Sequence, residues 1–273
     1  SLYPLELDFF FPQTTMAGVG RHLLFEVLNP SEKGRLVLNM TASLKSDGEN
    51  KLPPANAIGK TRELFPIIGR GSARVFSAPV APQVIDGGSY VAIDMGAEPK
   101  AFPNVKTGLM KVYGSEIPAD SRKLVGYGRD ISLISPQEYA GLTPPNLVGS
   151  FPTDLTNRSL EYSGVYEDGW LSEAAFFGLS QLNPATPLVI RGTIPGLSDP
   201  KFVTELQVLV DGKEVAQRTL KPGDFKLKLT PPEGQKRRRI DLRFSKWQNL
   251  PDPDKRPVAA KLSLIGFTTD EKN

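Results

Sequence analysis

The sequence contains no cysteine and a single histidine, His22, among its 273 residues. Without cysteine there is no disulfide, no thiolate metal ligand and no cysteine nucleophile. One histidine cannot complete a zinc site, and the sequence shows no partner that would make it a general base. No uninterrupted apolar run approaches the roughly 20 residues of a membrane span. These absences exclude many common enzyme chemistries, and no transmembrane segment is expected.

Positive charge is in slight excess, with 33 lysines and arginines against 30 aspartates and glutamates and a net charge of +3. Residues 151–200 carry 2 basic and 6 acidic groups, whereas residues 201–250 carry 12 and 6. A nucleic-acid-binding protein normally shows a broad excess of positive charge rather than one local basic stretch. We therefore expect no nucleic-acid partner.

Glycine and proline are abundant, with 25 of each. Long helices tolerate this load badly, whereas short strands joined by turns require it. Alternating and continuous apolar runs predict about seven strands in each half of the chain. The expected strands cover residues 5–11, 22–28, 35–44, 73–80, 90–95, 109–113 and 130–134, and then 174–179, 188–194, 205–210, 215–220, 225–229, 240–244 and 260–267. The predicted fold class is all-β.

One hairpin is specified locally. Leu206, Val208 and Val210 alternate along an expected strand, Asp211-Gly212 follows, and a further strand begins near Val215. Asp-Gly supplies the positive φ angles that a two-residue hairpin turn demands. The sequence therefore predicts a tight turn centred on these two residues.

Seven strands are the size of one β-sandwich, so the chain is long enough for two. Asp120-x-Arg122 and Asp254-x-Arg256 each precede the expected last strand of a half, as a repeat would, and each pair is expected to be structural. We predict two tandem antiparallel β-sandwich domains of the jelly-roll type, covering residues 1–135 and 159–273. The proline-rich segment 136–158 is interpreted as a stiff, docked connection.

Four motifs of the second half carry a resemblance to a known class of module. They are Tyr166-Glu-Asp-Gly-Trp170, Val210-Asp-Gly212, Leu220-Lys-Pro-Gly-Asp-Phe225 and Asp254-x-Arg256. Residues 160–270 resemble the jelly-roll, galactose-binding-like or carbohydrate-binding modules of bacterial cell-envelope proteins associated with glycosyltransferases. The resemblance implies a non-catalytic glycan-binding or scaffolding role at a periplasmic or cell-surface location. It also implies two partners, an envelope polysaccharide and the rest of a larger membrane protein.

Candidate ligand-binding residues follow from the chemistry of sugars. Trp247 with Gln248 and Asn249 offers an aromatic face and amides for hydroxyl groups, although packing of Trp247 against the core is an equal alternative. Arg237 and Arg238, within the run Lys236–Arg239, would form a basic face for anionic glycans, and charge that protects an edge strand is the simpler interpretation. Tyr166, from the first motif, is counted with this group.

A structural calcium ion is the one cofactor considered. Asp252 and Asp254 lie in an expected turn, and carboxylate and carbonyl oxygens are the ligands that Ca²⁺ prefers. Turn carboxylates that simply face water are the alternative.

Two other functions remain open at this level. A carbohydrate-active hydrolase or lyase would use carboxylates together with tyrosines such as Tyr113, Tyr162 or Tyr166. A docking module of a membrane glycosyltransferase would use no sugar at all. A polysaccharide turnover assay separates the enzyme from the binding module, and a glycan array separates binding from docking.

Overall fold

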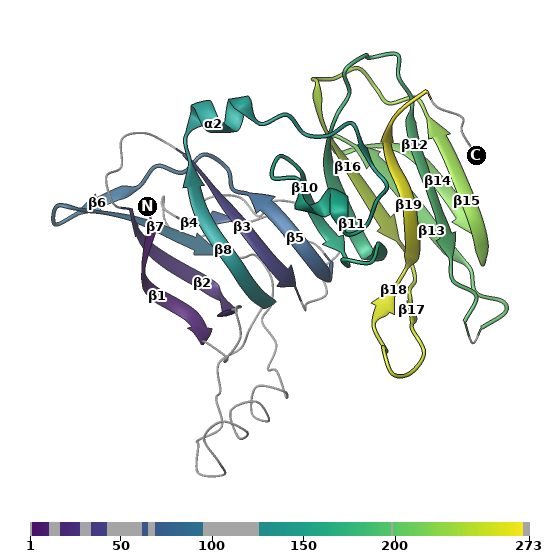
Figure 1. Cartoon of the computed structure of the whole chain (residues 1–273), viewed down its shortest axis with the longest axis horizontal. Helices are drawn as coiled ribbons and strands as arrows, with labels where there is room; N and C mark the ends of the chain where they lie inside the picture. Colours follow the sequence, from purple (N-terminus) through teal and green to yellow (C-terminus); the bar gives the residue numbers. More distant parts are fainter. Residues whose placement is uncertain are drawn as a thin grey trace, which may run out of the picture. The chain divides into compact units, whose positions relative to one another are not determined.

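The computed structural model describes residues 2–10, 17–27, 34–42, 62–64, 69–94, 126–197 and 199–269. Strands dominate these ranges, and most of their pairings are antiparallel, whereas β4 and β7 pair in parallel (Figure 1). The prediction of an all-β fold class is confirmed. The chain divides into two compact units, of which unit 1 comprises Ser1–Ile67 and Ala73–Gly141 and unit 2 comprises Ile68–Ser72 and Leu142–Asn273. The predicted boundaries at residues 135 and 159 stay predictions.

Unit 1 is built mainly from the first eight strands. These are β1 (Leu2–Phe10), β2 (Ala17–Val27), β3 (Arg35–Ala42), β4 (Arg62–Leu64), β5 (Gly71–Phe76), β6 (Gln83–Ile85), β7 (Gly88–Asp94) and β8 (Gly126–Ile134). Strand β2 pairs with β1, β7 and β8, and β8 pairs in turn with β3. Leu36, Val75 and Val91 are among its fully buried side chains, so the apolar face of these strands forms a core.

A short helix, α2 (Pro136–Gly141), ends unit 1. Ser135 and Glu138 form a capping box at its start: the Glu138 carboxylate accepts from the Ser135 N–H at 2.6 Å, and the Ser135 hydroxyl accepts from the Glu138 N–H at 3.1 Å. Hydrogen bonds from the backbone and the side chain of Ser135 to the carboxylate lower the pKa of Glu138. Inside the predicted connection 136–158 there is thus regular structure, which continues in unit 2 with β9 (Leu147–Val148) and the 3₁₀ helix η1 (Thr153–Thr156).

Unit 2 holds the remaining strands. They are β10 (Glu161–Val165), β11 (Trp170–Ser180), β12 (Leu188–Ile194), β13 (Thr204–Val210), β14 (Lys213–Leu220), β15 (Gly223–Leu229), β16 (Arg237–Phe244), β17 (Gln248–Asn249), β18 (Pro257–Val258) and β19 (Ala260–Phe267). The expected strands at 188–194 and 260–267 match β12 and β19 in both bounds. Strand β10 is not predicted by the sequence.

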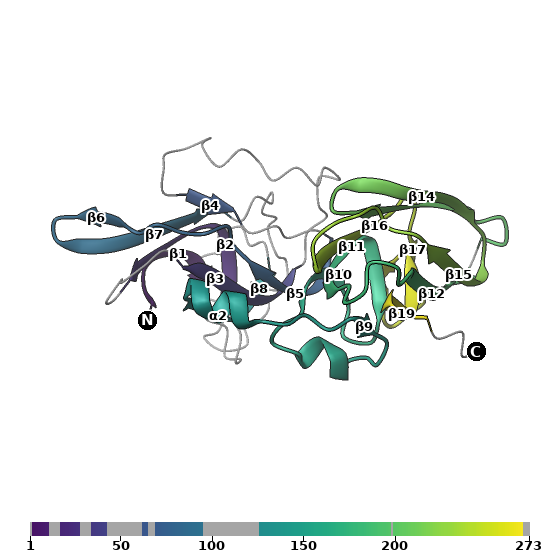
Figure 2. The same cartoon turned by 90° about the horizontal axis from the view of Figure 1, so that it is seen from above.

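The main strands of unit 2 form two antiparallel ladders. One runs in the order β10, β11, β16, β13, β14, and the other in the order β9, β19, β12, β15. They meet where Trp170 and Leu171 pair with Lys261 and Ala260. Figure 2 shows β14 and β16 in one layer of this unit and β12 and β19 in the other. Both ladders contribute fully buried apolar residues to a single core, with Phe177, Leu206 and Ile240 from the first and Ile190 and Ile265 from the second.

The hairpin predicted between β13 and β14 is confirmed. Val210 pairs with Lys213, which leaves Asp211 and Gly212 as the two turn residues. Their φ angles are 51° and 78°, the positive pair that a type I′ turn requires. Arg238 donates to the Asp211 carboxylate at 2.7 Å, so the corner is also held by a side chain.

Unit 2 includes a segment from the first half of the sequence, residues 68–72. The Arg70 N–H donates to the Ser172 hydroxyl at 3.0 Å. Gly69 has a φ of 66°, and a Cβ atom there would lie 2.2 Å from the Ala174 carbonyl oxygen. Only glycine allows so close an approach between backbones. We call residues 69–72 the inserted segment.

Part of the predicted pattern lies outside the described residues, namely the expected strand at 109–113 and the motif Asp120-x-Arg122. In the ranges that the structure describes, no helix has the length and hydrophobicity that a membrane crossing requires.

Candidate functional site

A small hairpin after β16 brings together most of the candidate residues. In this β17–β18 hairpin, Gln248 pairs with Val258 and Asn249 with Pro257. The Leu250 N–H donates to the Arg256 carbonyl at 2.9 Å, which closes the loop that contains Asp252 and Asp254. Gln248 and Asn249, with Trp247 directly before them, therefore share one hairpin with the two predicted calcium ligands.

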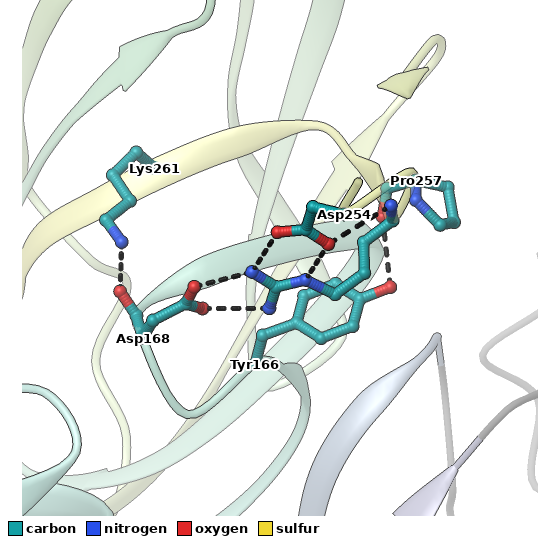
Figure 3. Close-up of polar contacts among 6 residues, drawn as sticks. Tyr166, Asp168, Asp254, Pro257 and Lys261 are labelled. Atoms are coloured by element: carbon teal, nitrogen blue, oxygen red, sulfur yellow. Dashed lines mark hydrogen bonds and ion pairs between the residues drawn. The ribbon is translucent and has the colours of Figure 1, made fainter. Parts of the chain in front are cut away.

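Arg256 ties this hairpin to the turn before β11 (Figure 3). Its Nε and Nη2 donate to Asp254 at 2.6 and 2.8 Å, and its Nη1 and Nη2 donate to Asp168 at 3.1 and 2.6 Å. Four of the five guanidinium N–H groups are thus used by two carboxylates, each in a bidentate arrangement. The expectation that Asp254 and Arg256 form a structural pair is confirmed, and Asp168 completes what we call the Arg256 clamp.

Tyr166 lies against the same clamp. The Arg256 guanidinium carbon is 4.8 Å from the centroid of the Tyr166 ring, and the Tyr166 hydroxyl donates to the Pro257 carbonyl at 3.0 Å. Burial raises the pKa of Tyr166 to about 12, so the hydroxyl keeps its proton and acts as a donor. Pro257 is the register partner of Asn249, so Tyr166 fixes the strand next to the candidate site.

Lys261 and Trp170 lie next to the Arg256 clamp, on the side of Asp168. The Lys261 ammonium donates to the backbone carbonyl of Asp168 and lies 5.1 Å from the centroid of the Trp170 ring. Trp170, which is half-buried, is thus part of the structural support around Asp168.

The charges of the clamp are mutually stabilised. Hydrogen bonds from Arg256 lower the pKa of Asp254. Burial acts to raise the pKa of Asp168, but hydrogen bonds and the positive charge of Arg256 outweigh it, and the net pKa is lowered. Hydrogen bonds from Asp254 and then from Asp168 raise the pKa of Arg256 further above its ordinary value. All three groups are charged at neutral pH.

The three candidate residues at the start of the hairpin differ in their surroundings. Trp247 is half-buried and packs against the core of unit 2, as the packing alternative expects, and its part in sugar binding stays a prediction. Gln248 donates from Nε2 to the Pro195 carbonyl at 2.7 Å, while its Oε1 is buried and accepts no hydrogen bond. Asn249 is exposed.

The expectation that Arg237 and Arg238 share an exposed basic face is corrected. Neighbours on a strand point to opposite sides, and both belong to β16. Arg238 is 1% exposed and donates to Asp211, to the Gln181 side chain and to the Pro232 carbonyl. Arg237 is half-buried and donates to the Leu142 carbonyl at 2.9 Å. Both arginines hold loops in place.

Both predicted calcium ligands contact cations of the chain. Asp252 pairs with Lys255 at 2.7 Å, and Asp254 belongs to the Arg256 clamp. Among the described residues no group of three histidine, cysteine, aspartate or glutamate side chains could hold a metal ion. Calcium binding stays a prediction that would require these carboxylates to exchange partners.

The tyrosines of the hydrolase alternative also have other contacts. Tyr162 is 4% exposed, and its hydroxyl lies 3.0 Å from the hydroxyl of Ser72 in the inserted segment. Tyr113 lies outside the described residues. The lowered pKa values of Asp168 and Asp254 are the opposite of what a general acid for glycoside hydrolysis needs.

The sequence did not predict that Asp168 and Lys261 contribute to this site. A carboxylate in a turn usually faces solvent, and a lysine at the start of a strand carries no motif. The signal that could have found them is the pairing of the two loose motifs, because Asp168 belongs to the first and Arg256 to the last.

Comparison with known proteins adds little. No protein-family model and no curated protein matches the sequence. Among solved structures, the chain is similar to the secreted serine protease VesC from Vibrio cholerae at 12% identity and a TM-score of 0.23, with 92% of this chain covered. The match spans 48% of the VesC chain. A similarity this low carries no argument about fold or function.

Proposed function

We propose that unit 2 is a non-catalytic glycan-binding or scaffolding module of a bacterial envelope protein, located in the periplasm or on the cell surface. In this proposal the chain is a tandem of two β-sandwiches, and unit 2 is jelly-roll-like. The two ladders of unit 2 with one core between them support this architecture.

The observation that carries the proposal is the anchoring of the β17–β18 hairpin. A two-residue ladder cannot hold its own shape in water. Here the Arg256 clamp and the Tyr166 hydroxyl fix it to the turn before β11, and Gln248 fixes it to Pro195. A small hairpin held at three points can present Trp247 and Asn249 in one geometry, as a preorganised binding site requires.

The chemistry of the presented groups suits a sugar. The accessible part of the half-buried Trp247 indole can pack against the apolar face of a pyranose ring, and the exposed Asn249 amide can both donate to and accept from hydroxyl groups. The surrounding carboxylates are held by arginine and lysine side chains, so they support the site and supply no acid–base pair. This favours binding over hydrolysis.

Binding to a panel of neutral and acidic oligosaccharides, measured by titration calorimetry on the full chain, tests the proposal. The expected affinity is weak, about micromolar to millimolar, because a shallow site buries little area. Asn249→Ala should weaken binding, since it removes an exposed amide without touching the core. Trp247→Ala should abolish binding, and Trp247→Phe should restore part of it.

The matched control is Gln217→Ala, which removes an exposed amide from the edge strand β14. It should leave affinity unchanged, and circular dichroism should show all variants folded. If the native chain gives no heat with any oligosaccharide, glycan binding is refuted. Scaffolding or docking to a membrane glycosyltransferase would then be the remaining function, tested by copurification with that enzyme.

A further inference from the structure

The inserted segment packs against the turn that precedes β11. A Cβ atom at Gly71 would lie 2.9 Å from the Val165 carbonyl oxygen and 3.0 Å from the Tyr166 nitrogen, so the two backbones are in direct contact there. The Tyr166 N–H donates to the Trp170 carbonyl at 2.8 Å and thereby closes the turn. The segment therefore contacts one side of the turn at the hydrogen bond that sets its shape.

A side-chain relay holds the segment on the other side of the same turn. The Arg70 N–H donates to the Ser172 hydroxyl at 3.0 Å, and that hydroxyl donates to Glu173 Oε2 at 2.6 Å. Glu173 is 8% exposed. A hydroxyl that donates to a carboxylate becomes a stronger acceptor, because hydrogen bonds in a chain polarise one another. The Glu173 carboxylate therefore strengthens the hold of Ser172 on the segment.

The turn between these contacts carries two residues that anchor the candidate site (Figure 3). Tyr166 donates to the Pro257 carbonyl, and Asp168 accepts from Arg256, so both fix the β17–β18 hairpin. The inserted segment, the turn, the Arg256 clamp and the hairpin thus form one continuous series of contacts. A shift of the turn at Gly71 would move both anchors of the hairpin together.

Docking of the segment is weakly driven. Its sequence, Gly69-Arg-Gly-Ser72, has no apolar side chain, so burial of apolar surface contributes little. Glu173 Oε1 is buried without a hydrogen-bond partner, and glycine loses more conformational entropy on ordering than any other residue. The apolar core of unit 2 is formed without residues 69–72. The segment can therefore leave the turn while this core stays folded.

We propose that docking of the inserted segment controls ligand affinity at the β17–β18 hairpin. This inference rests on the proposed function and adds its regulation: the docked segment holds the turn and the hairpin in the binding geometry, and release of the segment loosens both. Strand β5 runs from Gly71, in unit 2, to Phe76, in unit 1, so the segment is continuous in the chain with unit 1. Because coupling between two sites is reciprocal, a ligand at the hairpin must also favour docking of the segment.

Amide hydrogen exchange of the native full chain, followed by NMR, tests the reciprocal effect. The Arg70 N–H reports on docking, and the Leu250 N–H, which donates to the Arg256 carbonyl, reports on the hairpin. The Asp211 N–H, which donates to the Arg239 carbonyl, is the internal control. Near saturation with cellohexaose or oligogalacturonate, exchange of the Arg70 amide should slow about fivefold or more, while exchange at Asp211 stays within about twofold.

Matched glycine variants test the coupling from the side of the segment. Gly71 and Gly87 have φ angles of 94° and 84°, so alanine strains the backbone at both, but nothing lies within 4 Å of a Cβ atom at Gly87. We expect Gly71→Ala to speed exchange of the Leu250 amide and to weaken oligosaccharide binding, each about tenfold, and Gly87→Ala to change neither by more than about twofold. Ser172→Ala removes the acceptor of the Arg70 N–H and should act in the same direction, with Ser263→Ala, at an exposed position, as its control.

The outcomes separate this inference from the proposed function. Faster exchange at Leu250 in Gly71→Ala, with exchange at Asp211 unchanged, supports the coupling of segment and hairpin even where no oligosaccharide binds, and glycan binding alone then fails. Faster exchange at Arg70 without any change at Leu250 would overturn the coupling while glycan binding stands. Equal acceleration at Leu250 and Asp211 would show a general loss of stability in unit 2 and would also overturn it. Where Gly71→Ala does not fold, Ser172→Ala and its control give the same decision.

Discussion

Arg256 and Asp168 lie 88 positions apart in the sequence, yet Nη2 of one is 2.6 Å from a carboxylate oxygen of the other. The same guanidinium contacts Asp254, so two loops of unit 2 are joined through one side chain. Because Asp168 and Arg256 are each about a third to a half exposed, the clamp acts by geometry more than by burial.

Arg256→Lys should therefore destabilise unit 2 by about 1 kcal/mol, the upper end for exposed pairs, because an ammonium group cannot form two bidentate contacts. Urea unfolding of the full chain measures the loss. Lys255→Ala is the control, since its pair with Asp252 is 71% and 76% exposed. It should change stability by less than about 0.5 kcal/mol. Equal effects of the two changes would show that the clamp has no special role.

The clamp should also make stability depend on acid pH. Asp168 and Asp254 have folded-state pKa values below their usual range near 4, so the unfolded state takes up protons first as pH falls. Their contribution is present above about pH 5 and is lost as pH falls through the lowered pKa values. Glu138 of unit 1 contributes with the same sign. Urea midpoints between pH 3 and 7 should therefore fall less steeply in Arg256→Ala than in the native chain.

Arg238 should matter more to stability than any exposed arginine. Removing its side chain takes away the donor to Gln181 Oε1 and one donor to the Asp211 carboxylate, which keeps the Arg239 N–H, and the expected cost is about 3 kcal/mol. Arg218→Ala, on exposed β14, should cost less than about 0.5 kcal/mol. Thermal unfolding compares them. A small effect of Arg238→Ala would mean that water replaces its contacts, contrary to its 1% exposure.

The β13–β14 turn provides a backbone prediction. Gly212→Ala should cost about 1 kcal/mol or more, because a Cβ atom is strained at a φ of 78° even though nothing lies within 4 Å of it. Gly141→Ala, where the glycine is equally open and has no positive φ, should be neutral or stabilising. Urea unfolding of both variants measures the difference. Equal urea midpoints for Gly212→Ala and Gly141→Ala would contradict a turn that requires a positive φ at Gly212.

Features that depend on neighbours in sequence could be predicted. The apolar residues of β12 and β19 and the Asp-Gly turn are local patterns, and the structure confirms the strands and the turn. A run such as Lys236–Arg239 could not be resolved in this way. Its charges look alike in sequence, but the alternation of β16 sends Arg238 inward to Asp211 and leaves its neighbours on the other side.

Contacts between residues that lie far apart in the sequence could not be predicted from the sequence alone. Trp247, Gln248 and Asn249 were proposed as a binding site from their chemistry, but nothing local in the sequence shows that Tyr166 and Arg256 anchor their hairpin.

The inserted segment means that unit 2 cannot be cut from the gene as one continuous piece. Residues 69–72 are translated well before Leu142 and must wait for β10 and β11 to be made, so unit 2 is completed only late in synthesis. A shuffled or transplanted C-terminal half would arrive without the glycines that pack on Ala174 and Val165. A transfer of unit 2 to another protein, in evolution or by design, therefore has to include residues 69–72 as well as the part that begins at Leu142.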